Sequence, residues 1–441
     1  MVETREIYKT LDLALRVGEV LLSSGAGAAD VTATMWSVVH ACGVRGVDID
    51  VTFTSLTISH QASYDEPAMV QMRHVRHRDI DYEDLTVVDH IVTDLLRGDI
   101  DRDEARSRLM RVVSSGHRRP RWAATLGYGV MGGGVGMLLG GDWVVVVIAF
   151  VAAVAMDELM RAMSRRRLPN FYQQVAGGLL ATLIAVAAAA SDISVEPSFV
   201  VTVGIIMLLA GIGFMGAVQD ALTGFPLTAS ARGLEAMLAT GGIIAGVSGG
   251  LTVGEMLGVD LGRLDPGVGS LSQAGAVVVG SLIAAVAFAF ASYAPLRSLP
   301  VIGLVAGGAA AVSLAMDQQG FGRAWSAAAA AIFIGLVSYS LSGRVRVPPL
   351  VVVVSAIVPL LPGLSIYRGL SLLATGGNGL LSLMTAAAIA VALASGVILG
   401  EYVAQPLRRE ARRLEHRLSG PRLVGPLRAR AVKRRAGRTG D

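Results

Sequence analysis

Long apolar runs occupy most of the chain between residues 122 and 403. A helix needs about 20 apolar residues to cross a hydrocarbon core of roughly 30 Å. The pattern therefore predicts an α-helical polytopic membrane protein with ten transmembrane helices in two sets of five. The first set is expected at residues 122–140, 142–160, 171–190, 198–218 and 230–250, and the second at 273–293, 299–316, 322–342, 347–366 and 379–403.

The first 117 residues have a different, amphipathic pattern. Apolar residues recur at helical spacing from Ile7 to Leu22 and again from Val31 to Cys42. Strict alternation of apolar and polar residues from Val47 to Thr54 indicates a half-buried strand, and a second strand is expected around Met69–Val75. Two further helices are expected near residues 82–96 and 101–113, with Asp101 as an N-cap. The sequence predicts a small α+β domain built on a hairpin.

The two membrane halves end in similar sequences. With one residue of gap, Gly216 aligns with Gly363, Gly233 with Gly379, and the pair Gly254-Glu255 with Gly400-Glu401. Because each half has five expected spans, the second half enters the bilayer in the opposite orientation. Inverted repeats of this kind are typical of secondary transporters. We expect a domain order of cytosolic α+β domain, two inverted five-helix repeats and a basic cytosolic tail, at residues 1–117, 118–268, 269–405 and 406–441 respectively.

Charge is distributed unevenly along the chain. Residues 1–116 contain 19 Asp and Glu against 12 Lys and Arg, whereas residues 406–441 contain 12 Lys and Arg against 3 Asp and Glu. With ten spans, the arginine-rich loops all fall on one side, which the positive-inside rule makes cytoplasmic. The chain is thus expected in the cytoplasmic (inner) membrane of a bacterium, with both termini in the cytoplasm and the tail able to bind anionic lipids.

Composition excludes several function classes. The single cysteine, Cys42, leaves no intramolecular disulfide, and no phosphate-binding loop is present that would indicate drive by ATP. No cofactor, metal or nucleic-acid partner is expected. A metal site at His74, His77 and His90 is disfavoured, because their spacing matches no known ligand set. Homo-oligomerisation is left open, with the first domain as the expected contact.

The order of parts resembles the threonine/serine exporter family of bacteria. The resemblance covers essentially the whole chain and rests on the runs LLSSGAGAADVTATMWSVVHACGV, DIDVTFTSLTIS, QDALTGFPLTASAR and VPLLPGLSIYRGL. It implies a cytosolic domain joined to ten membrane helices, and export of small hydroxy amino acids driven by the proton motive force. After Gly25 the chain has Ala26-Gly27-Ala28-Ala29, where many members of the family have polar or charged residues.

Two glycine- and proline-interrupted segments occupy corresponding positions in the halves, residues 211–232 and 359–379. Such paired interruptions are the best sequence pointer to a transporter site. Ionisable residues inside a membrane are costly and are kept where they are paired or useful. Arg232 and Glu235 are three residues apart and are expected to pair on one helix face. The candidates for substrate or proton binding are Glu235, Arg232, Asp220, Pro362, Gly363 and Asn378, and those for a gate or proton path are Glu255 and Glu401.

The sequence favours a secondary active exporter of threonine, serine or similar small amino acids, working by alternating access and exchanging the solute for protons. Three alternatives remain open. The first is an exporter of small dicarboxylates, and the second is an ion or solute channel gated by the cytosolic domain. The third is a membrane-bound hydrolase that uses the neighbouring carboxylates of Asp48 and Asp50.

Overall fold

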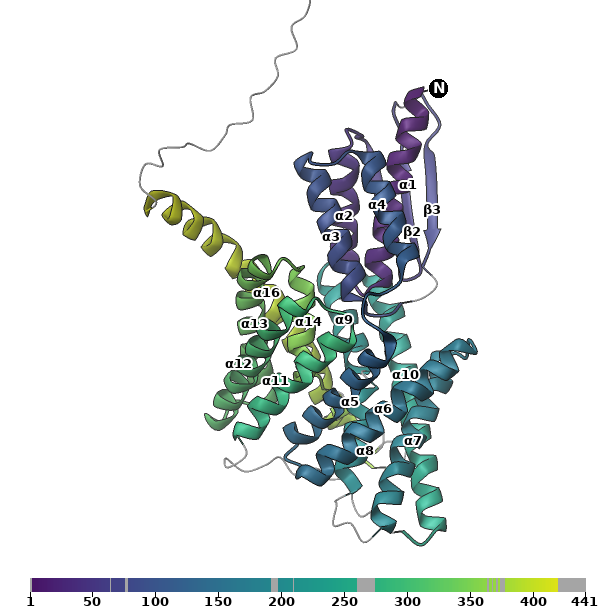
Figure 1. Ribbon diagram of the computed structural model, residues 1–441, viewed down its shortest axis with the longest axis vertical. Coiled ribbons are helices and arrows are strands. Elements are labelled where there is room, and N and C mark those ends of the chain that lie inside the picture. The colour runs from purple at the N-terminus through teal and green to yellow at the C-terminus, as the bar shows by residue number, and fades with distance from the viewer. Residues whose placement is uncertain are drawn as a thin grey trace, which may run out of the picture.

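The computed structural model describes residues 2–63, 65–75, 78–191, 197–208, 210–259, 274–362, 365–366, 368–369, 372 and 377–418. Residues 2–115 form a compact unit, here called the N-terminal unit, which lies at one end of the molecule (Figure 1). It contains four helices and three strands: α1 (Val2–Ser23), α2 (Ala28–Ala41), β1 (Val47–Val51), β2 (Ser55–His60), β3 (Met69–His74), α3 (Tyr82–Arg97) and α4 (Arg102–Ser115).

The three strands form one antiparallel sheet in the order β1-β2-β3, with Ile49 opposite Ile58 and Ile58 opposite Gln71. The expected hairpin of two strands was wrong, because β2 lies between the two predicted strands. Leu56 and Ile58 of β2 are fully buried, whereas Ser55, Thr57 and Ser59 are partly exposed. The sequence Ser-Leu-Thr-Ile-Ser alternates polar and apolar residues as a half-buried strand does, so the signal was present and was overlooked.

The helix boundaries of the N-terminal unit follow local capping chemistry. The Asp101 carboxylate accepts a hydrogen bond from the Glu104 amide at 2.7 Å, which confirms the predicted N-cap of α4. Asp81 caps α3 in the same way, and Gly98 ends that helix with a left-handed φ of 78°. The turn after α3 therefore reverses the chain so that α4 packs against α3 and α1.

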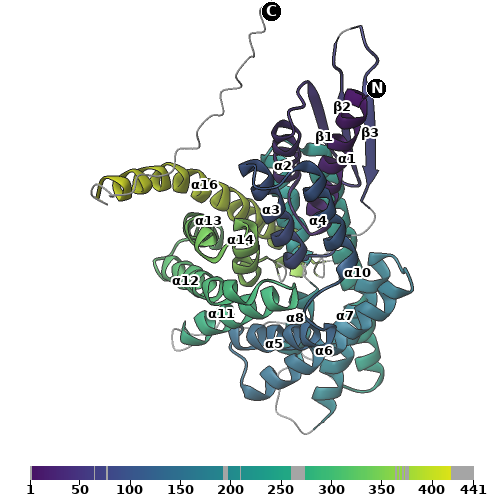
Figure 2. The same ribbon diagram turned by 45° about the horizontal axis from the view of Figure 1, so that its top comes forward.

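Membrane-type helices follow in two lobes. The first lobe comprises α5 (Arg121–Leu138), α6 (Trp143–Arg165), α7 (Asn170–Ala190), α8 (Pro197–Met207), α9 (Ala210–Leu222) and α10 (Pro226–Met256). The second comprises α11 (Ala274–Ala291), the short η2 (Leu296–Ser298), α12 (Leu299–Gln318), α13 (Arg323–Val345), α14 (Pro349–Ile357), η3 (Val358–Leu360) and α16 (Leu380–Leu418). Figures 1 and 2 show the two lobes side by side beneath the N-terminal unit.

Among the described residues, seven helices are long and apolar enough to cross a membrane, or up to eight if α8 and α9, bent by 44°, form one crossing. The chain is therefore a polytopic helical membrane protein. The two other expected crossings coincide with α5, which is rich in glycine, and α14, which has nine residues. Pro349 begins α14, and Pro359 and Pro362 follow it closely, so its helical hydrogen bonds cannot continue. The count of ten stays a prediction, as does the lipid-binding tail, whose residues 419–441 lie outside the described part.

Equivalent helices pack in equivalent ways in the two lobes. The third and fifth helices of each half, α7 with α10 and α13 with α16, run parallel with backbones in close approach. A Cβ added to Gly246 would lie 2.0 Å from the Val175 carbonyl oxygen, and one added to Gly400 would lie 2.4 Å from that of Ile332. Small residues allow this packing in membranes, where van der Waals contact drives helix association.

The first helices of the two halves, α5 and α11, pack against each other across the lobes. A Cβ at Gly134 would lie 2.8 Å from the Ala284 amide nitrogen, and one at Gly280 would lie 2.5 Å from that of Leu138. Residue numbers rise along α5 as they fall along α11, so the two helices are antiparallel. This orientation is the one expected of the first helices of two inverted five-helix units.

Candidate functional site

The N-terminal unit is joined to the membrane helices by several polar contacts. The Thr228 hydroxyl of α10 donates to the Val51 carbonyl at 3.2 Å, and the Tyr82 amide donates to the Ser292 carbonyl at 2.9 Å. His90 lies 3.0 Å from the Arg346 carbonyl oxygen. These contacts come from three regions of the unit and reach both lobes, so the unit covers the ends of α9, α10, α11 and α13.

Asp220 at the end of α9 makes a further, deeply buried contact with the N-terminal unit. It is 1% exposed, and its Oδ1 accepts a hydrogen bond of 3.0 Å from the Ala28 amide, at the start of α2. Its Oδ2 lies 2.8 Å from the Arg232 guanidinium of α10. The turn at Gly224, whose φ is 93°, reverses the chain and places these two side chains together. One carboxylate thus links α2, α9 and α10.

The expected ion pair between Arg232 and Glu235 was wrong. Among the ion pairs of the described residues, Arg232 pairs with Asp220, and Glu235 is exposed on the same helix. Spacing along α10 permits the predicted pair. The preceding helix nevertheless offers a buried carboxylate, and a charge-assisted contact is stronger there than at an exposed position.

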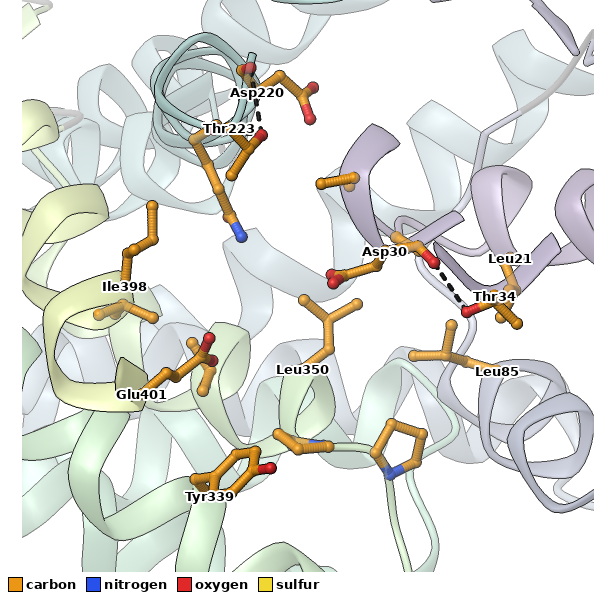
Figure 3. Close-up of a pocket in the computed structure, with 18 of the residues that line it drawn as sticks. Leu21, Asp30, Thr34, Leu85, Asp220, Thr223, Tyr339, Leu350, Ile398 and Glu401 are labelled. Atoms are coloured by element: carbon orange, nitrogen blue, oxygen red, sulfur yellow. Dashed lines mark hydrogen bonds between the residues drawn. The ribbon is translucent and has the colours of Figure 1, made fainter. Parts of the chain in front are cut away.

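Two cavities flank Asp220. The first, here called the carboxylate chamber, has a volume of about 440 Å³ and lies between α2, α3, α9, α14 and α16. Its walls include the side chains of Asp30, Asp89, Asp220 and Glu401, and Figure 3 shows Asp30 and Glu401 directed into it from opposite sides. Burial, together with the nearby Asp220 carboxylate, raises the pKa of Asp30, and burial raises that of Asp89. Carboxyls in this state take up protons more readily than carboxyls in water.

The second cavity, here called the arginine chamber, has a volume of about 220 Å³. Charged residues of both signs line it, namely Arg78, Asp79, Arg232 and Glu235. This volume is below the range of about 300–1,000 Å³ that is typical of sites for drug-sized ligands. The chamber therefore suits a small solute that has a positive and a negative group.

The two chambers share part of their wall. Gly27, Gln219 and Leu350 line both cavities, and these residues come from the N-terminal unit, α9 and α14. An added Cβ at Gly27 would lie 3.5 Å from Asp220 Oδ1, so this position lies directly beside the buried carboxylate. A shift of α9 or of the α1–α2 turn would change both chambers together.

A third cavity lies beyond the C-terminal end of α14, beside η3. It measures about 230 Å³, and its walls include Ser281, Asp317, Arg323 and Pro359. Leu350 at the start of α14 faces the two chambers, whereas Leu360 in η3 lines this far cavity. The short helix α14 thus lies between the two chambers, at its start, and the far cavity, beyond its end.

Of the remaining predicted residues, only Glu401 lines one of the two chambers. Glu255 is exposed at the end of α10 that is remote from the N-terminal unit, about 40 Å along the helix from Thr228. Glu401 lines the carboxylate chamber, so the two glutamates lie toward opposite ends of the bundle. Pro362 is buried after η3, and Asn378 is exposed before α16. Gly363 lies outside the described residues.

Sequence reasoning missed the residues that the N-terminal unit contributes. Asp30 belongs to α2, which begins in the glycine-rich turn after α1, and Arg78 follows β3. Both come within reach of α9 or α10 only because the unit docks on the membrane helices. The sequence signal for Asp30 was a charged residue beside a glycine-rich loop, but many surface loops have this combination.

Comparisons with known proteins agree on one family. Residues 12–254 match the family described as "Putative threonine/serine exporter", and residues 277–403 match "Threonine/Serine exporter, ThrE". The chain is 39% identical over 427 residues to the "Probable threonine/serine exporter" of Mycobacterium tuberculosis, covering 94% of this chain and 80% of that protein. It is 34% identical over 416 residues to the "Threonine/serine exporter" of Corynebacterium glutamicum, covering 92% and 85%.

No solved structure matches this chain. The family models together cover both lobes, and the two relatives cover nearly the full sequence. The chain therefore belongs to the threonine/serine exporter family, and it is a membrane transporter rather than an enzyme.

Proposed function

We propose that the chain exports threonine, serine or similar small amino acids across the bacterial inner membrane in exchange for protons. The names of its relatives support amino acid export. The observation that carries the proposal further is the arginine chamber, because it presents cationic and anionic side chains within about 220 Å³. An amino acid has both charges within a similar space and would be bound at both ends.

Glu235 is the proposed ligand of the substrate ammonium group. It lines the arginine chamber and, unlike Asp220, has no ion pair among the described residues. An ionised carboxylate attracts an ammonium group, whereas a protonated one does not. Proton and amino acid therefore compete for the same side chain. Competition of this kind couples the outward movement of one to the inward movement of the other.

The carboxylate chamber is the proposed route by which protons reach the site. Asp30 and Glu401 face each other across it, and Asp220 separates it from Arg232. Each proton that moves inward across 100 mV supplies about 2.3 kcal/mol, which supports a roughly fiftyfold concentration ratio of a neutral solute. One proton per zwitterion is sufficient to drive useful export.

Alternating access is proposed to occur around α14. The two chambers and the far cavity lie toward opposite ends of this helix, which is only nine residues long. The equivalent packing of α7 with α10 and of α13 with α16 supports two related units that rock against each other. Basic residues near the N-terminal unit, such as Arg119, Arg297 and Arg346, support a cytoplasmic location of that end.

Uptake of labelled threonine by proteoliposomes, with and without an imposed pH gradient, tests the proposal. Wild type is expected to show saturable uptake that the gradient accelerates. Glu235→Gln is expected to abolish the acceleration, and Glu104→Gln, an exposed substitution on α4, is expected to have no effect. If wild type transports neither threonine nor serine in any gradient, the proposal fails.

A further inference from the structure

Arg78 stands out among the charged residues of the arginine chamber. Its guanidinium is partly buried, and it lies 3.9 Å from the centre of the Phe53 ring. It also donates a hydrogen bond to the Phe53 carbonyl oxygen. These two contacts orient the side chain, but neither supplies a negative charge. Within the described residues, no carboxylate lies within ion-pair distance of Arg78.

The second arginine of the chamber is already paired. Arg232 lies 2.8 Å from Asp220, so most of its charge is balanced. Burial and the charge of Arg232 lower the pKa of Arg78 to about 10, while Glu235 and Asp220 act in the opposite direction. The cavity is thus lined by two guanidinium groups and by the carboxylates of Asp79 and Glu235. Among the described residues, Arg232 has a carboxylate within ion-pair distance and Arg78 has none, so Arg78 is the cation of this cavity that can pair with the carboxylate of a bound solute.

A partly buried cation is costly unless an anion balances it. A guanidinium has five N–H donors in a planar fork that fits the two oxygens of a carboxylate. The Phe53 carbonyl uses only part of this fork. Glu235 in the same chamber provides a negative charge for the other end of a zwitterion.

We propose that Arg78 binds the carboxylate of the transported amino acid while Glu235 faces its ammonium group. The N-terminal unit then supplies a direct substrate ligand and forms part of the transport site. This inference rests on the proposed function, because it takes the amino acid as substrate. It also explains why the N-terminal unit lies against the membrane helices, because the contact between Asp220 and Ala28 holds Arg78 beside α9 and α10.

Calorimetric titration of the purified full-length protein tests this assignment. The ligands are threonine and threoninol. Threoninol keeps the amine, the carbon skeleton and the hydroxyl group of threonine but lacks its carboxylate. Wild type is expected to bind threonine about ten- to hundredfold more tightly than threoninol, as a charge-assisted contact implies. Arg78→Gln is expected to remove this difference by weakening threonine binding and leaving threoninol binding unchanged.

Arg118→Gln is the matched control, since it removes the same charge from a side chain that follows the N-terminal unit and is 94% exposed. It is expected to bind both ligands as wild type does. If Arg78→Gln still prefers threonine as strongly as wild type, the assignment is overturned. If Arg78→Gln binds neither ligand, Arg78→Lys is titrated in its place. A weaker preference of Arg78→Lys for threonine over threoninol than in wild type supports the assignment, and an unchanged preference refutes it.

Failure of the proposed function gives a different result. Wild type would then bind no threonine, and the same titration with succinate would test Arg78 alone. Binding of succinate that Arg78→Gln abolishes would keep Arg78 as the anion ligand of another substrate class. Binding that is indifferent to the substitution, or no binding at all, would overturn the assignment.

Discussion

The contact of Asp220 with Ala28 and Arg232 allows a quantitative test of how the N-terminal unit is held. Asp220→Asn keeps an oxygen for the Ala28 amide but leaves the Arg232 guanidinium without a balancing charge. Breaking a buried ion pair by removing one partner costs about 3–5 kcal/mol. Asp220→Ala also removes the hydrogen bond of the Ala28 amide to a charged acceptor, which is worth about 1.5–3 kcal/mol more.

Replacing both partners removes the stranded charge. The double variant Asp220→Asn/Arg232→Gln is therefore expected to be less destabilised than the sum of the two single variants, by about 3 kcal/mol. Equilibrium unfolding of the purified protein in mixed micelles measures each free energy. Asp103→Asn is the control, because its carboxylate pairs with Arg102 at 3.3 Å but is 66% exposed. It should change stability by about 0–1 kcal/mol.

Hydrogen exchange at Ala28 gives a local readout of the same contact. Exchange of this amide should accelerate in Asp220→Ala far more than in Asp220→Asn, because only the former removes the acceptor. Two results would refute the role of Asp220 as the link between α2, α9 and α10. One is a double variant whose loss of stability equals the sum of the two single losses, and the other is equal exchange of the Ala28 amide in Asp220→Ala and Asp220→Asn.

Three further predictions concern packing and electrostatics. Gly246→Ala should destabilise the packing of α7 against α10 by about 1–3 kcal/mol, because the new Cβ meets the Val175 carbonyl oxygen. Gly249→Ala is the control and should cause no such loss, since no atom lies within 4 Å of its new Cβ. Thermal unfolding compares the two variants. Burial and Asp81 raise the pKa of Asp84 to about 6, so its protonated form is favoured in the folded state. Stability should therefore fall as pH rises from about 4 to 6, and Asp84→Asn should flatten this fall in unfolding measurements made across that range. Asp157→Asn breaks a 2.7 Å contact with Arg121 and should cost about 1–3 kcal/mol in the same unfolding assay.

Hydropathy predicted the membrane helices well because each span is a long apolar run. The expected span at residues 299–316 corresponds to α12 (Leu299–Gln318), and that at 322–342 corresponds to α13 (Arg323–Val345). The expected span at 347–366 agrees less well with the structure, because prolines interrupt it and the helix α14 covers only Pro349–Ile357. Apolar composition reports the environment of a segment, but not whether its backbone stays helical.

The candidate site was predicted only in part. Asp220, Arg232, Glu235 and Glu401 each line one of the two chambers. The rarity of charge inside apolar segments was the signal for the first three, and the internal repeat was the signal for Glu401. The pairing within this group depends on how α9 and α10 fold back on each other, which local spacing does not encode. Arg78 escaped prediction because its neighbours from the membrane helices, such as Arg232 and Glu235, are more than 130 residues away in sequence.

The central claim is that amino acid and proton move in opposite directions through one site. The most direct test records the internal pH of proteoliposomes with a trapped fluorescent indicator while threonine is added to one side. We expect threonine to drive a saturable proton movement in the opposite direction, which Glu235→Gln abolishes. Saturable threonine flux with no accompanying proton movement would contradict the claim.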